Sequence, residues 1–460
     1  MKKLGIYIHI PFCVKKCVYC DFLSFPADNA AKRTYVAALQ EEIRAVAKDY
    51  SAYEVQSVFF GGGTPSCMEK ELIGDCLLTV REQFCVADDA EISMEVNPKT
   101  ASLEKLEYFR KAGINRLSIG LQSADDRELK RIGRIHDYRT FLETYRLARE
   151  AGFRNINIDL MAALPGQSVA SYRETLRRVT ALLPEHISAY SLILEEGTPL
   201  YERRGDYCFP TEEEDREMYL LTDACLSDCG YHRYEISNYA REGYECRHNK
   251  VYWQRGDYAG FGLGAASMVD NVRWSNPTVP EDYAAYITGL GRRCEEPDGQ
   301  EEEPVHTEKM QRFPVRCRLT GNEQMEEFMF LGLRMMCGVS RREFQERFGR
   351  QIEEVYGGVL CKMYRQELLE CVSDHIRLTG LGIDDFPVGM LAAGALLQYL
   401  NETQKTELAH FTHIIPYLTN KYMLLDSSTR RNLELTETLR EKQKRGSLLW
   451  VLDKTRTAMG

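Results

Sequence analysis

The alternation of strand-like and helix-like segments between residues 4 and 193 most constrains how this chain folds. Short apolar runs typical of buried strands are each followed by a longer stretch with helical periodicity. Consecutive units of this kind build a parallel sheet with crossover helices. We therefore predict an α/β fold in which six βα units form a closed or nearly closed barrel. The expected strands cover 5–10, 55–60, 91–96, 116–121, 155–160 and 186–192, and the expected helices cover 31–49, 69–83, 102–112, 138–151 and 169–183.

The residue types that carry chemistry stand at the carboxyl ends of these expected strands. In parallel sheets this edge holds the ligand site, because the loops that follow the strands meet there. In chain order they are the loop with Cys13, Cys17 and Cys20, the turn Gly61-Gly62-Gly63-Thr64-Pro65, Glu95, Gln122 and Asp159.

Cys13, Cys17 and Cys20 have the spacing C-x3-C-x2-C. This spacing supplies three thiolates to a four-iron cluster and leaves the fourth iron free to bind a small molecule. The alternatives are half of a zinc site or inert thiols. Zinc requires four tetrahedral ligands, and no further Cys or His follows at finger-like spacing. The pattern therefore favours an iron–sulfur cluster over zinc.

The glycine turn and four polar residues near the strand ends suit a second ligand. Glycine lets the backbone approach a ligand closely, and the amides of such a turn can hold a charged group. Glu95 and Asp159 can accept hydrogen bonds from sugar hydroxyls, while Arg134 can pair with a carboxylate. Together with Gln122 they could bind a nucleoside-bearing amino acid. Each residue alone would most often be a satisfied edge residue, and any tight βα turn can contain a glycine run.

A second constellation is Cys246-Arg247-His248-Asn249-Lys250-Val251-Tyr252-Trp253. A histidine beside a Tyr-Trp pair suits a planar cofactor such as heme, with the imidazole as axial ligand. Cys246 and His248 could also hold a transition metal, although two ligands make a weak site. From these residues alone, a histidine in an aromatic core is the favoured interpretation.

The second half of the chain is less regular. Residues 194–290 are aromatic, with glycine-rich turns around 256–264, and the run 297–303 has the composition of a solvated linker. Helical patterns at 326–348 and 351–372 precede a strand-like segment at 376–379, an order that suits a small winged-helix-like domain.

Composition limits the classes of function. The net charge of -10 and the pI near 5.6 argue against a general nucleic-acid or anionic-membrane surface. The amino terminus lacks the apolar run of a signal peptide, and no run approaches the ~20 residues of a membrane span. We expect a cytoplasmic protein whose 15 cysteines are mostly free thiols.

The motifs resemble the radical S-adenosylmethionine enzymes. Within them, the chain is similar to the oxygen-independent coproporphyrinogen III oxidase-like group, and His248-Asn249-x-x-Tyr252-Trp253 resembles its heme chaperone branch, HemW. The resemblance covers about residues 1–383. It is carried by Tyr7 through Cys20, Gly61 through Pro65, Arg116-Leu-Ser-Ile-Gly-Leu-Gln122-Ser123 and Asp159-Leu-Met-Ala-Ala-Leu-Pro-Gly166.

This resemblance implies three cofactors and their binding residues. Cys13, Cys17 and Cys20 would ligate a [4Fe-4S] cluster whose free iron binds S-adenosylmethionine, and His248 would bind heme. The heme would be handed to an acceptor protein, for instance in the respiratory chain. By motif position, the residues that contact S-adenosylmethionine would be Tyr7, Gly62, Gly63, Thr64, Glu95, Gln122, Arg134 and Asp159.

Two departures from the oxidases favour a chaperone over an enzyme that decarboxylates coproporphyrinogen III, which is the alternative function. Phe22 occupies the position of a further cysteine in those oxidases. Tyr7 lies only six residues before Cys13, so the longer amino-terminal arm of the oxidases is not expected. Separately, Ala266 replaces a histidine that is usual in the family near the heme region, so any contribution from that second histidine is missing.

The last stretch, about 385–460, resembles part of the core of the DNA mismatch-repair protein MutS. It contains no mismatch-reading domain and no ATP-binding loop, so a role in DNA repair is a second and weaker alternative. We interpret it as an accidental join. The predicted domains are a radical S-adenosylmethionine partial barrel at 1–200, a barrel extension with the heme motif at 201–295, a winged-helix-like domain at 304–383 and a helical MutS-like fragment at 385–460.

Overall fold

The computed structural model describes residues 1–295 and 314–380, which belong to one compact unit within residues 1–387. Most of the expected linker and the MutS-like stretch lie outside the described residues. The limits of the expected domains stay predictions. None of the described helices combines the length and the apolar character that crossing a lipid bilayer requires.

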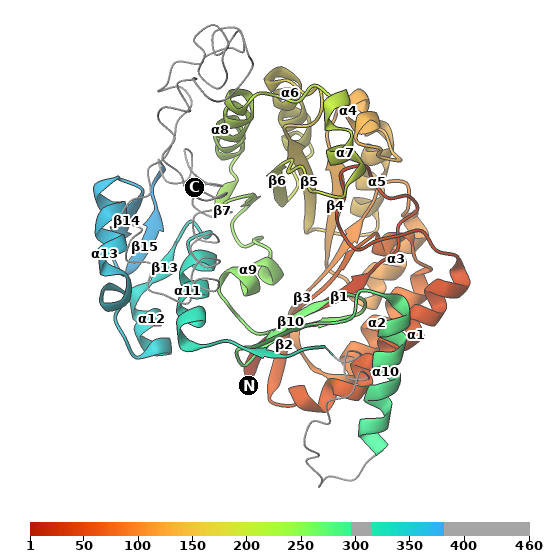
Figure 1. Ribbon diagram of the computed structural model, residues 1–460. Coiled ribbons are helices and arrows are strands. Elements are labelled where there is room, and N and C mark those ends of the chain that lie inside the picture. The colour runs from red at the N-terminus through yellow and green to blue at the C-terminus, as the bar shows by residue number, and fades with distance from the viewer. Residues whose placement is uncertain (296–313, 381–460) are drawn as a thin grey trace, which may run out of the picture. The chain divides into compact units, whose positions relative to one another are not determined.

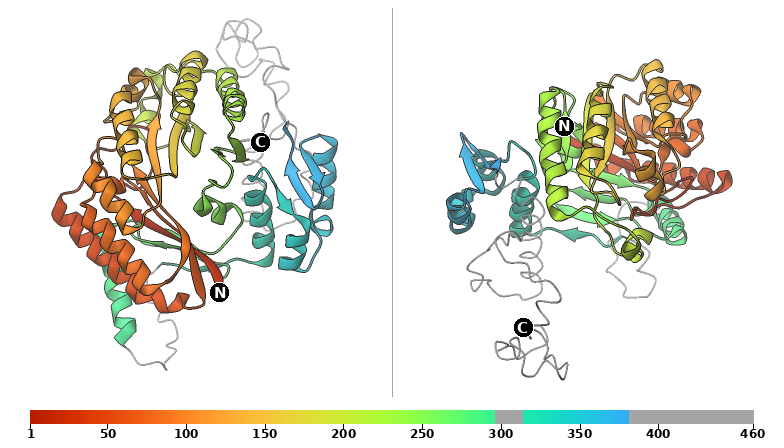
Figure 2. Two further views of the ribbon diagram at one scale, coloured as in Figure 1. Left: turned by 180° about the vertical axis from the view of Figure 1, so that it is seen from behind. Right: turned by 90° about the horizontal axis from the view of Figure 1, so that it is seen from above.

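Six parallel strands form the centre of the fold, and each pairs with the next strand along the chain (Figure 1). Most of their side chains are buried, and helices cover the outer face, as both views in Figure 2 show. The predicted α/β partial barrel is therefore confirmed. The strands are β1 (Lys2–Ile10), β2 (Tyr53–Gly62), β3 (Cys85–Val96), β4 (Arg116–Gln122), β5 (Ile156–Ala162) and β6 (His186–Ser191).

The crossover helices agree with the expected ones to within a few residues, except that α4 was not expected. Most begin at a polar residue whose side chain accepts a hydrogen bond from the first turn, as Asp28 does from the amide of Ala31. The helices are α1 (Asn29–Val46), α2 (Lys70–Gln83), α3 (Leu103–Ala112), α4 (Asp126–Arg131), α5 (Tyr138–Glu150) and α6 (Val169–Thr180), with short 3-10 turns η1 (Ala47–Tyr50) and η2 (Pro65–Cys67).

The segment 194–295 is more regular than its sequence suggested, and it extends the sheet at both edges. Strands β8 and β7 continue the sheet beyond β6, whereas β9, β10 and β11 continue it beyond β1, followed by β12. The elements are α7 (Pro199–Glu202), η3 (Arg204–Asp206), α8 (Glu212–Asp228), β7 (His232–Glu235), β8 (Asn238–Ala240), α9 (Arg247–Trp253), β9 (Tyr258–Phe261), β10 (Ala266–Val269), β11 (Val272–Ser275), α10 (Pro280–Glu295) and β12 (Cys317–Arg318).

Helix α9 positions the second constellation. It connects β8, near one edge of the sheet, to β9, beside β1, and it packs against β2. Figure 1 shows it within the curve of the sheet rather than on the outer layer of helices. The motif that contains His248 therefore faces the interior of the barrel.

The carboxyl-terminal region consists of helices and a small antiparallel sheet in the order β13-β15-β14, as expected for a winged-helix-like arrangement. The long helix expected at 326–348 is two helices instead. The chain turns at Gly338, where φ is +69° and a Cβ atom would lie 2.0 Å from the carbonyl oxygen of Ile376. The elements are α11 (Gly321–Gly332), β13 (Val339–Ser340), α12 (Arg341–Phe348), α13 (Ile352–Arg365), β14 (Leu369–Val372) and β15 (His375–Leu378).

Candidate functional site

The three cysteines lie on the loop that follows β1, and all three are partly buried free thiols. The loop is fixed by backbone hydrogen bonds from Cys13 to Phe25 and from Val18 to Ile132. Burial raises the pKa of Cys20. Among the described residues, no three His, Cys, Asp or Glu side chains are already grouped as a metal site. The thiols therefore share one loop without meeting at one point.

The glycine turn after β2 packs directly against this loop. The amides of Gly63 and Thr64 donate to the carbonyl oxygens of Ile10 and Phe12 at 2.8 and 2.7 Å. A Cβ atom on Gly63 would lie 2.6 Å from the Phe12 oxygen, so only glycine allows this approach. The amide of Gly62 donates to Glu95 at 3.1 Å. In this structure the amides of the turn thus hold protein groups.

Arg134 lies beside the cysteine loop, and Gln122 is at the end of β4. The Arg134 guanidinium donates to the Gly120 carbonyl at 2.5 Å and to Asn97 at 3.0 Å. Its Nη1 is 3.8 Å from Sγ of Cys17. Gln122 ends β4 with a positive φ of 73°. A guanidinium next to Cys17 provides a positive charge where thiolates would gather.

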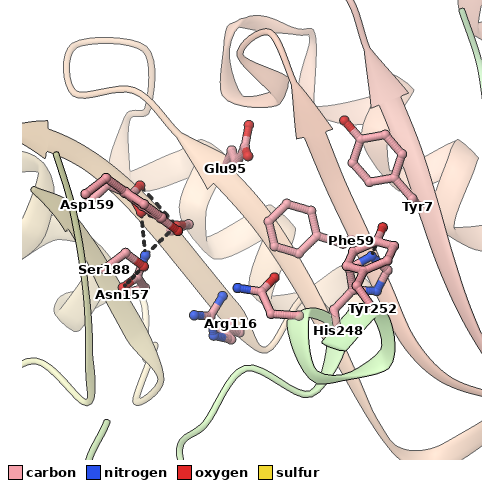
Figure 3. Close-up of a pocket in the computed structure, with 12 residues that line it drawn as sticks. Tyr7, Phe59, Glu95, Arg116, Asn157, Asp159, Ser188, His248 and Tyr252 are labelled. Atoms are coloured by element: carbon pink, nitrogen blue, oxygen red, sulfur yellow. Dashed lines mark hydrogen bonds between the residues drawn. The ribbon is translucent and has the colours of Figure 1, made fainter. Parts of the chain in front are cut away.

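Tyr7, Glu95 and Asp159 face a cavity of about 210 Å³ inside the barrel (Figure 3). Burial and the charge of Asp159 raise the pKa of Glu95 to about 8. Asp159 accepts hydrogen bonds from Asn157 at 2.7 Å and from Ser118 at 3.1 Å. The full lining is Tyr7, Phe59, Glu95, Arg116, Ser118, Asn157, Asp159, Ser188, Tyr190, His248, Asn249 and Tyr252.

His248 lines the same cavity and is 1% exposed. Its Nδ1 is hydrogen-bonded to the hydroxyl of Ser57 and its Nε2 to the hydroxyl of Tyr252, each at 2.9 Å. The ring stacks on Phe59 at 5.2 Å between centroids. Burial, followed by the charge of Arg116, lowers the pKa of His248 to about 3, so the imidazole is neutral. Neutral imidazole is the form that ligates metals, but neither nitrogen is free here.

Glu91 of β3 holds the start of α9 in place. Its carboxylate accepts the amide hydrogens of Arg247 at 3.0 Å and His248 at 3.2 Å, and the thiol of Cys246 donates to it at 3.4 Å. Cys246 is therefore engaged with Glu91 and is not oriented with His248 as a metal-ligand pair.

The two aromatic residues of the motif have different positions. Tyr252 is one helical turn after His248 and meets its ring edge to face. Trp253 does not line the cavity; its indole stacks with the guanidinium of Arg334 at 4.2 Å. The Tyr252 ring can therefore pack on a cofactor in the cavity, as expected, but the Trp253 ring cannot.

Sequence analysis missed Arg116, a cavity residue at the start of β4. It is 2% exposed, and its Nε has no hydrogen-bond partner. The two-residue period of a strand places Arg116, Ser118, Gly120 and Gln122 on the same face. Because buried arginines almost always require a partner, an arginine on the strand face that carries Gln122 could have been recognised from the sequence as a candidate binding residue.

Comparisons with known proteins place the chain in a family. Residues 7–179 match the radical SAM superfamily, residues 319–384 match the HemN C-terminal domain, and residues 428–460, outside the described part, match MutS domain III. In fold, the chain is similar to coproporphyrinogen III oxidase (HemN) from Escherichia coli, with a TM-score of 0.68 at 24% identity, covering 82% of this chain and 87% of that one.

Two curated relatives extend over most of their own length. Heme chaperone HemW of Bacillus subtilis is 35% identical over 382 residues, which are 82% of this chain and 95% of the relative. Radical S-adenosyl methionine domain-containing protein 1, mitochondrial, of Mus musculus is 34% identical over 346 residues, 75% of this chain and 76% of the relative. The barrel, the cysteine loop and this likeness to relatives along most of their length show that the chain belongs to the HemW family of heme chaperones within the radical SAM superfamily.

Proposed function

We propose that this protein is a cytoplasmic heme chaperone that binds heme at His248, carries a [4Fe-4S] cluster with S-adenosylmethionine, and delivers heme to an acceptor protein. One observation carries the proposal. His248 lines the same 210 Å³ cavity as Tyr7, Glu95 and Asp159, the residues expected to contact S-adenosylmethionine. The heme motif and part of the S-adenosylmethionine motif therefore lie in one chamber, although they are distant in sequence.

The donor set on the loop fits an iron–sulfur cluster. Cys13, Cys17 and Cys20 provide three thiols on one loop, one ligand fewer than the four of a structural zinc site. When bound, a cluster with three protein ligands supplies one iron with an open coordination position. Thr64, whose hydroxyl is 3.4 Å from Sγ of Cys13, and Arg134 beside Cys17 would help to hold it.

The heme side requires movement. The cavity is smaller than the ~300–1,000 Å³ of common small-molecule pockets, and a porphyrin is a large ligand. Nε2 of His248 becomes available to iron only when the Tyr252 hydroxyl leaves it. The hydrogen bond from Nδ1 to Ser57 can remain and orient the ring, as partners of metal-bound histidines commonly do. We therefore expect Nε2 to be the ligand atom.

Heme titration of the full chain tests this proposal. We expect His248→Ala to weaken heme binding at least about tenfold and to change the Soret band, with the cluster spectrum unchanged. His232→Ala is the matched control, because this surface histidine pairs with Glu245 away from the cavity. Equal heme affinity and equal spectra for wild type and His248→Ala would rule out the assignment.

An anaerobic assay addresses the alternative activity. The reconstituted protein would be given S-adenosylmethionine, a reductant and coproporphyrinogen III. We expect no substantial protoporphyrinogen, since Phe22, the residue in place of the further cysteine of the oxidases, is 61% exposed and offers no thiol. Efficient decarboxylation would overturn the chaperone function.

A further inference from the structure

Arg116 is a buried positive charge in the wall of the cavity without a partner of its own. It is 2% exposed, its guanidinium forms no ion pair with any described residue, and its Nε donates no hydrogen bond. A buried charge is strongly unfavourable unless an opposite charge meets it. The side chain is in view near the centre of Figure 3.

The groups that act on the charge of Arg116 are those of Cys246, Glu91, Tyr234 and Asp159, and each is already engaged elsewhere. Glu91 accepts from the start of α9, and Cys246 donates to Glu91. Asp159 accepts from Asn157 and Ser118. The hydroxyl of Tyr234 is hydrogen-bonded to Nε2 of His186 at 2.8 Å. The charges of these groups offset the burial of Arg116, but none of them accepts a hydrogen bond from its Nε, which stays free to donate to an anion from outside.

The position of Arg116 in the sheet indicates which anion. In the strand register Phe59 pairs with Ser93, and Ser93 pairs with Arg116, so Phe59 and Arg116 share one level of the barrel. The ring of Phe59 stacks on that of His248. Arg116 is two strands from Phe59, a span of ~10 Å. This span is comparable to the distance from the centre of a porphyrin to its propionates.

Arg134, the second arginine of the candidate site, lies at the opposite end of β4 from Arg116. Arg134 is beside Cys17, at the carboxyl ends of the strands, and is the expected partner of the S-adenosylmethionine carboxylate. Arg116 stands at the opposite end of β4, below Ser118. S-adenosylmethionine and heme each carry a carboxylate. Arg134 is available to the first ligand at one end of β4, which leaves Arg116 at the other end available to the second.

Resting on the proposed function, we propose that Arg116 binds a propionate carboxylate of the heme, so that the cargo is held at two points, the iron by His248 and the edge by Arg116. The aromatic side chains of Phe59, Tyr7 and Tyr252 provide the apolar wall along which a planar macrocycle can lie. A pair of fixed points also sets the orientation of the cargo.

The test compares heme with its dimethyl ester, in which both propionates lose their charge. The full chain is titrated anaerobically as wild type, Arg116→Gln, Arg116→Lys and the surface control Arg127→Gln. Wild type and Arg127→Gln should bind heme at least about tenfold more tightly than the ester. Arg116→Gln should bind both ligands equally, and Arg116→Lys should recover part of the preference for free heme.

The other outcomes are distinct. A wild type that binds heme and the ester with equal affinity overturns this inference alone and leaves the proposed function standing. A wild type that binds neither overturns both. If Arg116→Gln keeps its preference for heme but loses affinity for S-adenosylmethionine, the guanidinium serves the other carboxylate and the inference is wrong. Should Arg116→Gln fail to fold, the wild type and Arg116→Lys still decide the question through the two ligands.

Discussion

A hydrogen bond of 2.9 Å joins the hydroxyl of Tyr252 to Nε2 of His248, one turn earlier in α9. The two residues are four positions apart, so the helix itself brings them together. The bond occupies the nitrogen that we expect to bind iron. In the proposed function, Tyr252 therefore competes with the heme for His248.

Replacing Tyr252 by Phe should strengthen heme binding. The substitution keeps the ring that meets His248 but removes the hydroxyl, so ligation no longer breaks a hydrogen bond. A typical bond of this kind corresponds to a gain of about two- to tenfold in affinity. Titration followed at the Soret band measures it, with Tyr108→Phe as the control on the outer helix α3. Weaker binding by Tyr252→Phe would mean that the hydroxyl contacts the heme directly.

Replacing Ser57 by Ala should have the opposite effect. Its hydroxyl is the partner of Nδ1, and the loss of such a partner commonly lowers metal affinity about 10–100-fold. The same titration, together with thermal unfolding of the apoprotein, separates lost orientation from lost stability. Unchanged heme affinity would show that Ser57 does not orient the ligand. Combined in one chain with Tyr252→Phe, the two opposed shifts should partly cancel.

Replacing Cys17 by Ala should abolish the four-iron chromophore. The two remaining thiolates cannot retain a cube that needs three protein ligands. Visible absorption and EPR spectra after anaerobic reconstitution report the cluster. Cys229→Ala is the matched control because that thiol is exposed at the end of α8 and is not part of the loop. A full cluster signal from Cys17→Ala would exclude this cysteine as a ligand.

Replacing Glu42 by Gln should change how stability depends on pH. Burial raises the pKa of Glu42 from 4.5 to about 7, while it accepts hydrogen bonds from Gly262, Asn276 and Tyr283. The folded state thus keeps a proton that the unfolded state loses between pH 4.5 and 7, and stability falls over this range by up to about 3 kcal/mol.

Denaturant unfolding at several pH values checks this expectation. Glu42→Gln has no proton to lose, so its stability relative to the wild type should rise as the pH increases from 4.5 to 7 and then level off. Glu41→Gln, on the exposed side of the same helix, should follow the wild type. A constant difference between Glu42→Gln and wild type at all pH values would contradict the raised pKa.

Local patterns determined the elements of the barrel. The six strands were predictable because strands of a parallel sheet are buried on both faces, and their sequences are therefore short runs of apolar residues. Helix α8 was missed, although Thr211 and Glu214 form a capping box that marks its start. The helix expected at 326–348 was overextended because the turn at Gly338 depends on Ile376, which is distant in sequence.

The sequence by itself determined which residues stand at the strand ends, and hence the cysteine loop and the expected partners of a nucleoside ligand were predicted without coordinates. Only the tertiary structure decided what surrounds His248 and Arg116. Ser57 and His248 are 191 positions apart and meet because α9 folds into the barrel. Arg116 is left without a partner because its acidic neighbours bond to other groups. Such contacts join residues distant in sequence, and local periodicity carries no information about them.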